Sequence, residues 1–395
     1  MFLRVNARFY IILFVILCIF FATGIVASKV YIDNNNITIV NGEPFFPLGL
    51  YIASDPNTDA SIRELDEIAD SPFNTIMNYK INVGSIEQIR HYLDAVNERK
   101  LKIIYSIKDF YKGTEYYPGK IDNYEGEDEM VRGVITEFKH HPAILAWYIN
   151  DELPSKYIPR LIKRYKTVKA LDPDHPIWSV IYQVDELKSY LDTTDVIGAD
   201  PYPIPEKPIS MVSEWTEMVN KAAGTKKAVW MVPQAHNLSL YSKEKHVVGP
   251  TFDQMRCMAY QCLTNDANGL IFYSFPDLKR DPLGFEKRWT DVKRLGTEIS
   301  SLMPVLLSTD TIPKVQLLSG AQHIHFFVKC YDGKFYIIAV NTSDKAQDAE
   351  FTISEEVKSV KVLFEDRFII MDKYHLKDTF PSIAVHIYEI EISSR

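Results

Sequence analysis

Carboxylate side chains follow several short apolar runs of this sequence, at the points where the runs end. Asp151 and Glu152 follow AWYIN, Asp200 follows VIGA, and Asp109 follows IIYSIK. A carboxylic acid can give a proton to a leaving oxygen atom, and a second carboxylate can attack the substrate or activate a water molecule. Such a set of residues is suited to the cleavage of a glycosidic bond.

The apolar runs that would position these carboxylates recur eight times, and amphipathic segments with helical spacing separate them. Continuous apolar strands are typical of a parallel sheet that is buried on both faces, so the alternation predicts a closed (β/α)₈ TIM barrel. An open doubly wound sheet is the alternative, but the sequence has no GxGxxG or GxxxxGK turn. The expected strands cover residues 46–51, 73–78, 101–107, 144–150, 177–182, 196–200, 228–234 and 269–275.

The length of 395 residues exceeds that of a barrel of about 250 residues, so a second module is expected. After about residue 306 the pattern changes to short alternating strands, which predict a small antiparallel β-sandwich. We therefore divide the chain into an export segment over residues 1–28, a catalytic barrel over residues 29–305 and a β-sandwich over residues 306–395.

The N-terminus has the pattern of an export signal. Arg4 and Arg8 precede an uncharged apolar run over residues 9–27. The run is long enough to cross a bilayer and its cleavage sites are imperfect, so a cleaved signal peptide and a retained anchor both stay open. In either case we expect the barrel on the non-cytoplasmic side, with membrane contact only through this segment.

Composition narrows the possible partners. The net charge is −8 and Lys and Arg are scattered, which argues against a nucleic-acid partner. The four Cys suggest no disulfide framework, and neither CxxC nor HExxH is present, so we expect no metal site and no cofactor. A neutral or weakly charged partner is favoured.

In a barrel of this type the active site lies at the carboxyl ends of the strands, so the side chains there are candidates. Glu152 lies between an apolar strand and Leu153-Pro154, and we expect it in an apolar surround as the proton donor. Aromatic rings at these ends could stack on sugars, although each could equally belong to the core. The candidates for substrate binding are Tyr51, Asn78, Tyr148, Tyr202, Trp230, Gln234 and Tyr273.

Several segments together resemble the clan A glycoside hydrolases: FPLGLY, AWYINDELP, VIGADPYP, VWMVPQA, GLIFYSF and AVHIYEIEI. The resemblance covers nearly the whole chain after the export segment. It implies a glycosidase that acts without a cofactor on an extracellular oligo- or polysaccharide. Glu152 matches the acid/base Glu that follows an Asn at the end of strand four in that clan, although here Asp151 stands between them.

The sequence departs from the clan pattern at strand seven, where Gln234 replaces the nucleophilic Glu. An amide cannot form a glycosyl ester, which puts the double-displacement mechanism in doubt. Two mechanisms stay open: inversion with Asp200 or Asp109 as the base, and substrate assistance in which Asp151 orients a 2-acetamido group. The alternative to an enzyme is a catalytically inactive surface protein that binds carbohydrate or acts as a scaffold.

Overall fold

The computed structural model describes residues 28–241, 249–320, 322–372 and 374–392. Nearly all of the predicted export segment lies outside these ranges. Within them, no helix has the length and the apolar character needed to cross a membrane.

Eight parallel strands close into a barrel in the order β4-β5-β6-β9-β10-β11-β12-β13, and β13 pairs with β4. Each expected strand is present, so the predicted TIM barrel is confirmed. The strands are β4 (Leu48–Ile52), β5 (Thr75–Asn78), β6 (Lys102–Ser106), β9 (Ile144–Asp151), β10 (Ile177–Val180), β11 (Val196–Gly198), β12 (Ala228–Met231) and β13 (Gly269–Phe272).

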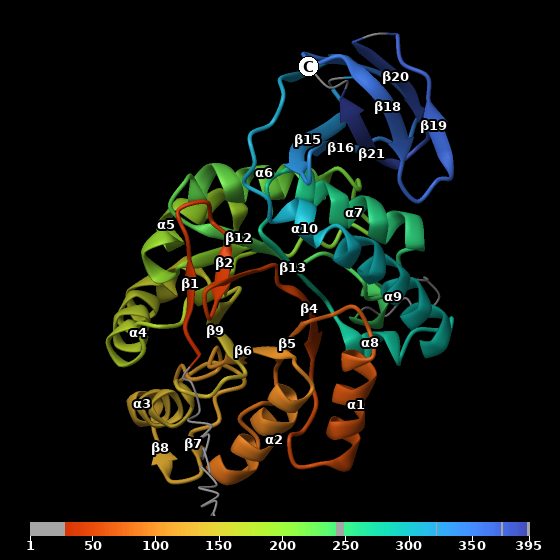
Figure 1. Cartoon of the computed structure of the whole chain (residues 1–395). Helices are drawn as coiled ribbons and strands as arrows, with labels where there is room; N and C mark the ends of the chain where they lie inside the picture. The colour runs from red at the N-terminus through yellow and green to blue at the C-terminus, as the bar shows by residue number, and fades with distance from the viewer. Residues whose placement is uncertain (1–27, 242–248, 321, 373, 393–395) are drawn as a thin grey trace, which may run out of the picture.

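Helices cover the outside of the barrel (Figure 1). In α2, the side chain of Ser85 and that of Gln88 cap the first turn, and Ile89, Leu93 and Val96 recur on the buried face. The α-helices are α1 (Asp59–Ala69), α2 (Ile86–Glu98), α3 (Glu127–Phe138), α4 (Ile158–Leu171), α5 (Leu187–Tyr190), α6 (Met211–Ala223), α7 (Phe252–Thr264), α8 (Phe275–Leu278), α9 (Phe285–Ser301) and α10 (Met303–Leu306). Short 3₁₀ turns cover Ser155–Tyr157, Val184–Glu186, Leu191–Thr193 and Leu238–Tyr241.

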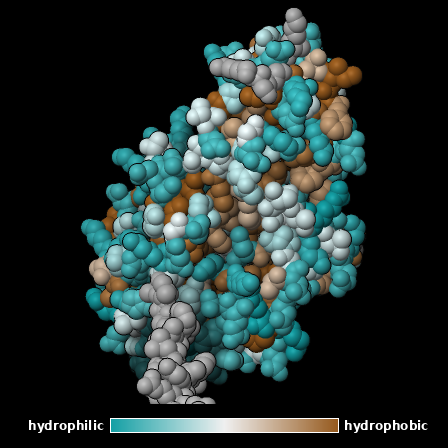
Figure 2. Space-filling model, in the orientation of Figure 1, coloured by the Kyte–Doolittle hydropathy of each residue, from teal (hydrophilic) through white to brown (hydrophobic). Residues whose placement is uncertain are grey.

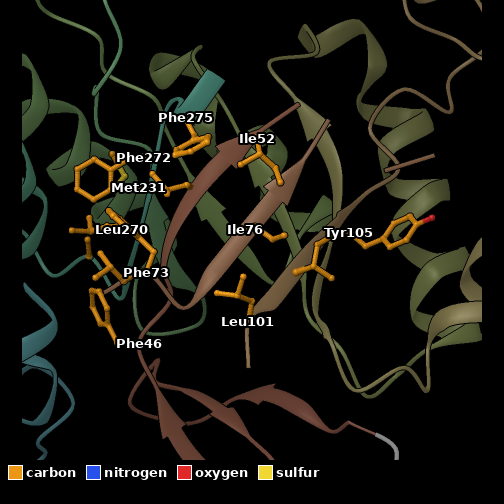
Figure 3. Close-up of a cluster of buried hydrophobic side chains, with 14 of the residues drawn as sticks. Phe46, Ile52, Phe73, Ile76, Leu101, Tyr105, Met231, Leu270, Phe272 and Phe275 are labelled. Carbon is orange, nitrogen blue, oxygen red and sulfur yellow. The ribbon is translucent and has the colours of Figure 1, made fainter. Parts of the chain in front are cut away.

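The main hydrophobic core lies between the strands and these helices. Figure 3 shows part of it, with Ile76 of β5, Met231 of β12 and Phe272 of β13 among the buried side chains. A β-hairpin, β7 (Lys120–Ile121) and β8 (Tyr124–Glu125), precedes α3. Because both faces of each barrel strand are buried, the polar side chains that could take part in a reaction lie at the strand ends.

A three-stranded antiparallel sheet closes the amino end of the barrel. It consists of β1 (Val30–Ile32), β2 (Thr38–Val40) and β3 (Glu43–Phe45). Val30 and Val40 pack with the side chains that fill the barrel interior, and the N–H of Val30 donates to the carbonyl oxygen of Asp174 at 2.8 Å. The opposite end, where the strands terminate, is therefore the open end.

The C-terminal region forms the predicted antiparallel sandwich next to α7 and α10 (Figure 1). One sheet contains β14 (Val315–Ser319), β17 (Gln347–Ile353) and β20 (His375–Phe380). The other contains β15 (Ile324–Tyr331), β16 (Lys334–Asn341), β18 (Val357–Val362), β19 (Arg367–Ile369) and β21 (Val385–Ile392). Helix α10 ends at Leu306 and β14 begins at Val315, and the division near residue 305 stays a prediction.

Two of these strands, β14 and β20, are not among the sandwich strands that the sequence predicts, which are IHFFVKC, KFYIIAVN, AEFTI, SVKVLFE, FIIM and AVHIYEIEI. No residue of β14 is buried, and in β20 only Leu376 and Phe380 are buried. The face in Figure 2 is mainly hydrophilic, with hydrophobic residues gathered in part over these C-terminal sheets. Phe364, Phe368 and Ile370 are the exposed apolar side chains around β19.

Candidate active site

A cavity of about 250 Å³ opens at the carboxyl ends of the barrel strands. Carboxylates and aromatic rings make up nearly all of its wall, and they come from the ends of β4, β5, β9, β11 and β13 and from the segment that follows β12. The lining residues are Tyr51, Tyr79, Asp151, Glu152, Asp200, Tyr202, His236, Leu238, Tyr241 and Tyr273.

Glu152 occupies the first position after β9 with a φ of 58°, in the left-handed region. Two backbone contacts hold it there: its N–H donates to the carbonyl oxygen of Val180 at 3.0 Å, and its carbonyl accepts from Gln183 Nε2 at 3.1 Å. Such a conformation is costly for a residue other than glycine, and it marks functional turns. The turn carries the side chain out of the apolar strand, so the expected apolar surround is wrong: Glu152 is exposed in the cavity.

Asp200 lies at the end of β11 and is only 8% exposed. Among the described residues its Oδ1 atom has no hydrogen-bond partner. Burial raises the pKa of Asp200 well above its ordinary value, and the hydrogen bond and charge of Glu152, followed by the charge of Asp151, raise it further. Asp200 therefore keeps its proton to a higher pH than an ordinary aspartate does.

Asp151 is the anchored member of the acidic group. Its Oδ1 accepts a 2.5 Å hydrogen bond from the hydroxyl of Tyr148, and its Oδ2 lies 3.3 Å from Lys108 Nζ. Tyr148 in turn accepts a hydrogen bond from the hydroxyl of Tyr51 at 3.3 Å. These contacts fix Asp151 in the wall of the cavity, next to Glu152.

Asp109 is separate from this group. It lines a neighbouring cavity, and its Oδ1 lies 2.9 Å from Lys108 Nζ. Burial raises the pKa of Asp109, against the opposing effect of the Lys108 charge. Lys108, which the sequence prediction omits, therefore bridges Asp109 and Asp151; its position directly after the apolar run IIYSI is the signal that would have found it.

The predicted binding residues divide into two groups. Tyr51, Tyr202 and Tyr273 line the cavity, and Tyr148 reaches it through Asp151. The rings of Tyr202 and Tyr273 lie 5.6 Å apart and form a continuous aromatic wall. This wall offers apolar ring faces next to the acidic group, as a sugar ring requires.

Asn78, Trp230 and Gln234 do not line the cavity, which corrects their prediction as binding residues. The amide of Asn78 donates to the carbonyl oxygen of Ser54 and accepts from the N–H of Lys80, both at 2.9 Å. Trp230 is fully buried in the barrel interior. All three side chains are therefore engaged within the protein: Asn78 faces α2, Trp230 faces the barrel interior and Gln234 faces the loop after β11.

Gln234 has a specific structural role. Its Nε2 donates to the carbonyl oxygens of Ile204 at 2.7 Å and of His236 at 3.2 Å, and its Oε1 accepts from the N–H of Ile204 at 2.9 Å. The side chain therefore fastens the loop after β11 to the end of β12. The strand-seven position that carries a nucleophile in clan A holds a structural amide here.

His236, Tyr79 and Tyr241 complete the wall, although they are not among the predicted site residues. Burial lowers the pKa of His236 to about 4, so its ring is neutral at physiological pH. Its Nδ1 lies 3.2 Å from the carbonyl oxygen of Tyr273, which requires the proton to be on Nδ1. His236 and Tyr79 follow predicted strands and could be found by that rule, whereas Tyr241 lies in a later 3₁₀ turn and could not.

Within the described residues, no three His, Cys, Asp or Glu side chains are grouped so that they could hold a metal ion. The acidic residues of the cavity are instead engaged with Lys108, tyrosine hydroxyls and one another.

No protein-family model matches this sequence, and no curated protein is similar to it. Solved structures, however, match most of the chain. A glycoside hydrolase family 5 protein from Bacteroides vulgatus gives a TM-score of 0.63 at 12% identity, over 93% of this chain and 94% of that one. An Anoxybacillus α-amylase gives 0.59 at 11%, over 88% and 99%, and a GH27 β-L-arabinopyranosidase from Geobacillus stearothermophilus gives 0.59 at 10%, over 88% and 97%.

The chain shares its fold with these solved glycoside hydrolases. The expected resemblance in architecture, a closed barrel followed by antiparallel sheets, is thereby confirmed. At identities of 10–12% these structures show the fold alone.

Proposed function

We propose that this protein is a glycosidase that cleaves an O-glycosidic bond of an extracellular oligo- or polysaccharide. The observation that supports the proposal best is the pair formed by buried Asp200 and exposed Glu152, in contact within an aromatic cavity at the open end of the barrel. Two carboxyl groups with different environments are what acid-assisted cleavage of a glycosidic bond needs.

The proton donor in this proposal is Asp200 rather than Glu152. A general acid must hold its proton at the working pH, and the pKa of Asp200 is raised by burial and by Glu152. Glu152, in contrast, is exposed in the cavity, where its carboxyl group can reach a substrate. The sequence prediction made Glu152 the proton donor and Asp200 a candidate base, so this proposal gives both residues a different role.

We assign a retaining mechanism to this pair. Inverting enzymes keep their carboxyl groups roughly 6.5–9.5 Å apart to admit a water molecule, whereas retaining enzymes place them at about 5–5.5 Å. Asp200 and Glu152 share a hydrogen bond, so without a substrate between them their carboxyl groups lie closer than either range and nearer to the shorter one. The Glu152 carboxylate attacks the anomeric carbon while Asp200 protonates the leaving oxygen; Asp200 then deprotonates the water that hydrolyses the glycosyl ester.

Asp151 supports a second candidate mechanism, substrate assistance. Its carboxylate is fixed by Tyr148 and Lys108 in the same cavity, so it could orient a 2-acetamido group. In that case the acetamido oxygen of the substrate forms the bond to the anomeric carbon. Glu152 would then form no ester, which separates the two mechanisms by experiment.

The test is a hydrolysis assay with a broad panel of aryl glycosides and natural oligosaccharides. We expect turnover that Asp200→Asn and Glu152→Gln each reduce by about 10²–10⁴-fold in kcat. The matched control is Asp332→Asn, in the exposed turn between β15 and β16, which should leave kcat unchanged. Absence of turnover with every substrate, together with glycan binding, would instead establish the inactive binding protein.

A mechanism-based trap then distinguishes the nucleophiles. A 2-deoxy-2-fluoro glycoside of the cleaved sugar should add one glycosyl unit to the peptide that contains Glu152, as measured by mass spectrometry. An active enzyme that accumulates no adduct and cleaves only 2-acetamido sugars would overturn the assignment of Glu152 and favour Asp151 as the orienting group.

A further inference from the structure

A second cavity lies directly beside the catalytic one. Its volume is about 580 Å³, against about 250 Å³ for the catalytic cavity. Tyr79, Asp151 and Tyr273 line both. The two cavities therefore adjoin one another at these three side chains. If the smaller cavity holds the sugar ring at the cleaved bond, the larger one lies next to that ring and has more than twice the volume.

The second cavity has aromatic surfaces of its own, which Tyr79 and Tyr116 supply. Tyr79 forms the shared wall and Tyr116 is 68% exposed on the outer side. Lys108 Nζ lies 4.8 Å from the centre of the Tyr79 ring and 5.7 Å from that of the Tyr116 ring, so one cation holds both rings in place. An exposed aromatic side chain fixed at a cleft is a platform for the apolar face of a sugar.

A polar group in the same wall is also held in a fixed orientation. Asn82 Nδ2 donates to the carbonyl oxygen of Ser106 at 2.7 Å, and Asn82 Oδ1 accepts from the hydroxyl of Tyr105 at 3.0 Å. Both ends of this amide are engaged within the protein, so Asn82 keeps the wall in place rather than binding a ligand.

The charges of the cavity balance. Lys80 and Lys108 stand against Asp109 and Asp151, two positive and two negative groups. Lys108 is engaged by both carboxylates, at 2.9 Å and 3.3 Å, and its side chain is only 10% exposed. It is therefore not available to pair with the carboxylate or sulfate of an acidic sugar. An uncharged ligand suits the cavity best.

We infer that this second cavity binds further units of the substrate chain, so that the protein acts on uncharged oligosaccharides that fill at least three consecutive sugar positions. The inference rests on the proposed function for the place of the cleaved bond. It adds the class of the substrate, its minimum length and a ring, Tyr116, that recognises the chain without touching the reacting atoms.

The test measures binding to the Asp200→Asn variant of the full chain by calorimetry. The probes are cello-, manno-, xylo-, malto- and chito-oligosaccharides of one to five units. In the series that binds, we expect the affinity to rise by roughly tenfold or more between one and three units. Tyr116→Ala in the same background should erase this rise, and Tyr116→Trp should preserve it. Tyr331→Ala, at an exposed tyrosine of the C-terminal sandwich, is the matched control and should change nothing.

Three results would overturn the inference: affinity that does not rise with chain length in any series, a rise that survives Tyr116→Ala, or tighter binding of oligogalacturonates than of every neutral series. The parent protein separates this inference from the proposed function. Hydrolysis by the parent without a length-dependent affinity removes only the inference. A length-dependent affinity that Tyr116→Ala erases, with no hydrolysis by the parent, leaves the binding cavity in place and removes the catalytic proposal.

Discussion

Two buried aspartates, one at each end of the barrel, show opposite electrostatic behaviour. Asp172 follows α4 near the closed amino end and is 1% exposed; Asp200 lies at the open carboxyl end and is 8% exposed. Burial acts to raise the pKa of Asp172, but hydrogen bonds from His175 and Trp147 outweigh it and the pKa is lowered. The pKa of Asp200 is raised.

The difference lies in the partners rather than in the burial. Asp172 Oδ2 is 2.8 Å from His175 Nδ1 and accepts from Trp147 Nε1 at 2.7 Å, so its negative charge is compensated. Asp200 instead lies against a second carboxyl group, that of Glu152. A buried acid with a full set of donors supports the fold, whereas one that faces another acid keeps a proton available for transfer.

The first prediction tests whether a carboxylate takes part in catalysis merely because it lies at the open end of the barrel. Gln234→Glu restores the strand-seven Glu of clan A. It also turns a carboxylate toward the carbonyl oxygens of Ile204 and His236, to which the amide now donates. We expect a loss of about 3 kcal/mol in the free energy of unfolding and no gain in kcat. Urea denaturation and the hydrolysis assay measure the two effects. A stable variant with higher kcat would show that strand seven still provides the nucleophile.

The second prediction concerns the closed end. Asp172→Asn replaces a charged acceptor of two hydrogen bonds by a neutral amide, so we expect a loss of about 2 kcal/mol in the free energy of unfolding. The kcat of the folded fraction should remain that of the parent protein. Denaturation monitored by circular dichroism gives the stability. Unchanged stability would contradict the view that the donors around Asp172 compensate its charge.

The third and smallest effect is the pH dependence of stability in Asp200→Asn. The pKa of Asp200 is higher in the folded than in the unfolded chain, so the folded protein retains a proton that the unfolded chain releases. This residue therefore makes stability fall as the pH rises from the ordinary Asp range through the raised pKa. Asp200→Asn should remove that fall and be more stable than the parent at neutral pH, with the difference shrinking in acid.

Urea denaturation of both proteins at pH 4, 6 and 8 tests the direction in which the stability difference changes with pH. Titrating groups that do not interact with Asp200, including His236, contribute equally to the two proteins and cancel in the difference. A parent protein that gains stability relative to Asp200→Asn as the pH rises would mean that Asp200 is compensated like Asp172, and the comparison would fail.

Much of the fold follows from the sequence because apolar runs of a buried parallel sheet are continuous and repeat eight times. The strands β14 and β20 escape prediction because they contribute few buried side chains to the sandwich. Their place is set by pairing with β17, a long-range contact that local patterns do not contain.

The candidate site follows from the sequence only in part. The strand-end rule locates Asp151, Glu152 and Asp200 in one cavity, because the carboxyl ends of the strands meet there. It cannot say which acid is buried, since that depends on the left-handed turn at Glu152. Nor can it separate Tyr202, which faces the cavity, from Gln234, which faces the backbone of a neighbouring loop.

The sheet β1–β3 makes the two ends of the barrel different. It begins at Val30, two residues after the predicted export segment, and it closes the barrel at the end opposite the catalytic cavity. If the export segment is retained, it would therefore attach the barrel to the membrane through its closed amino end, and the open end would face away from the lipid surface. Long glycans could then enter the cleft from the surroundings without passing between the protein and the bilayer.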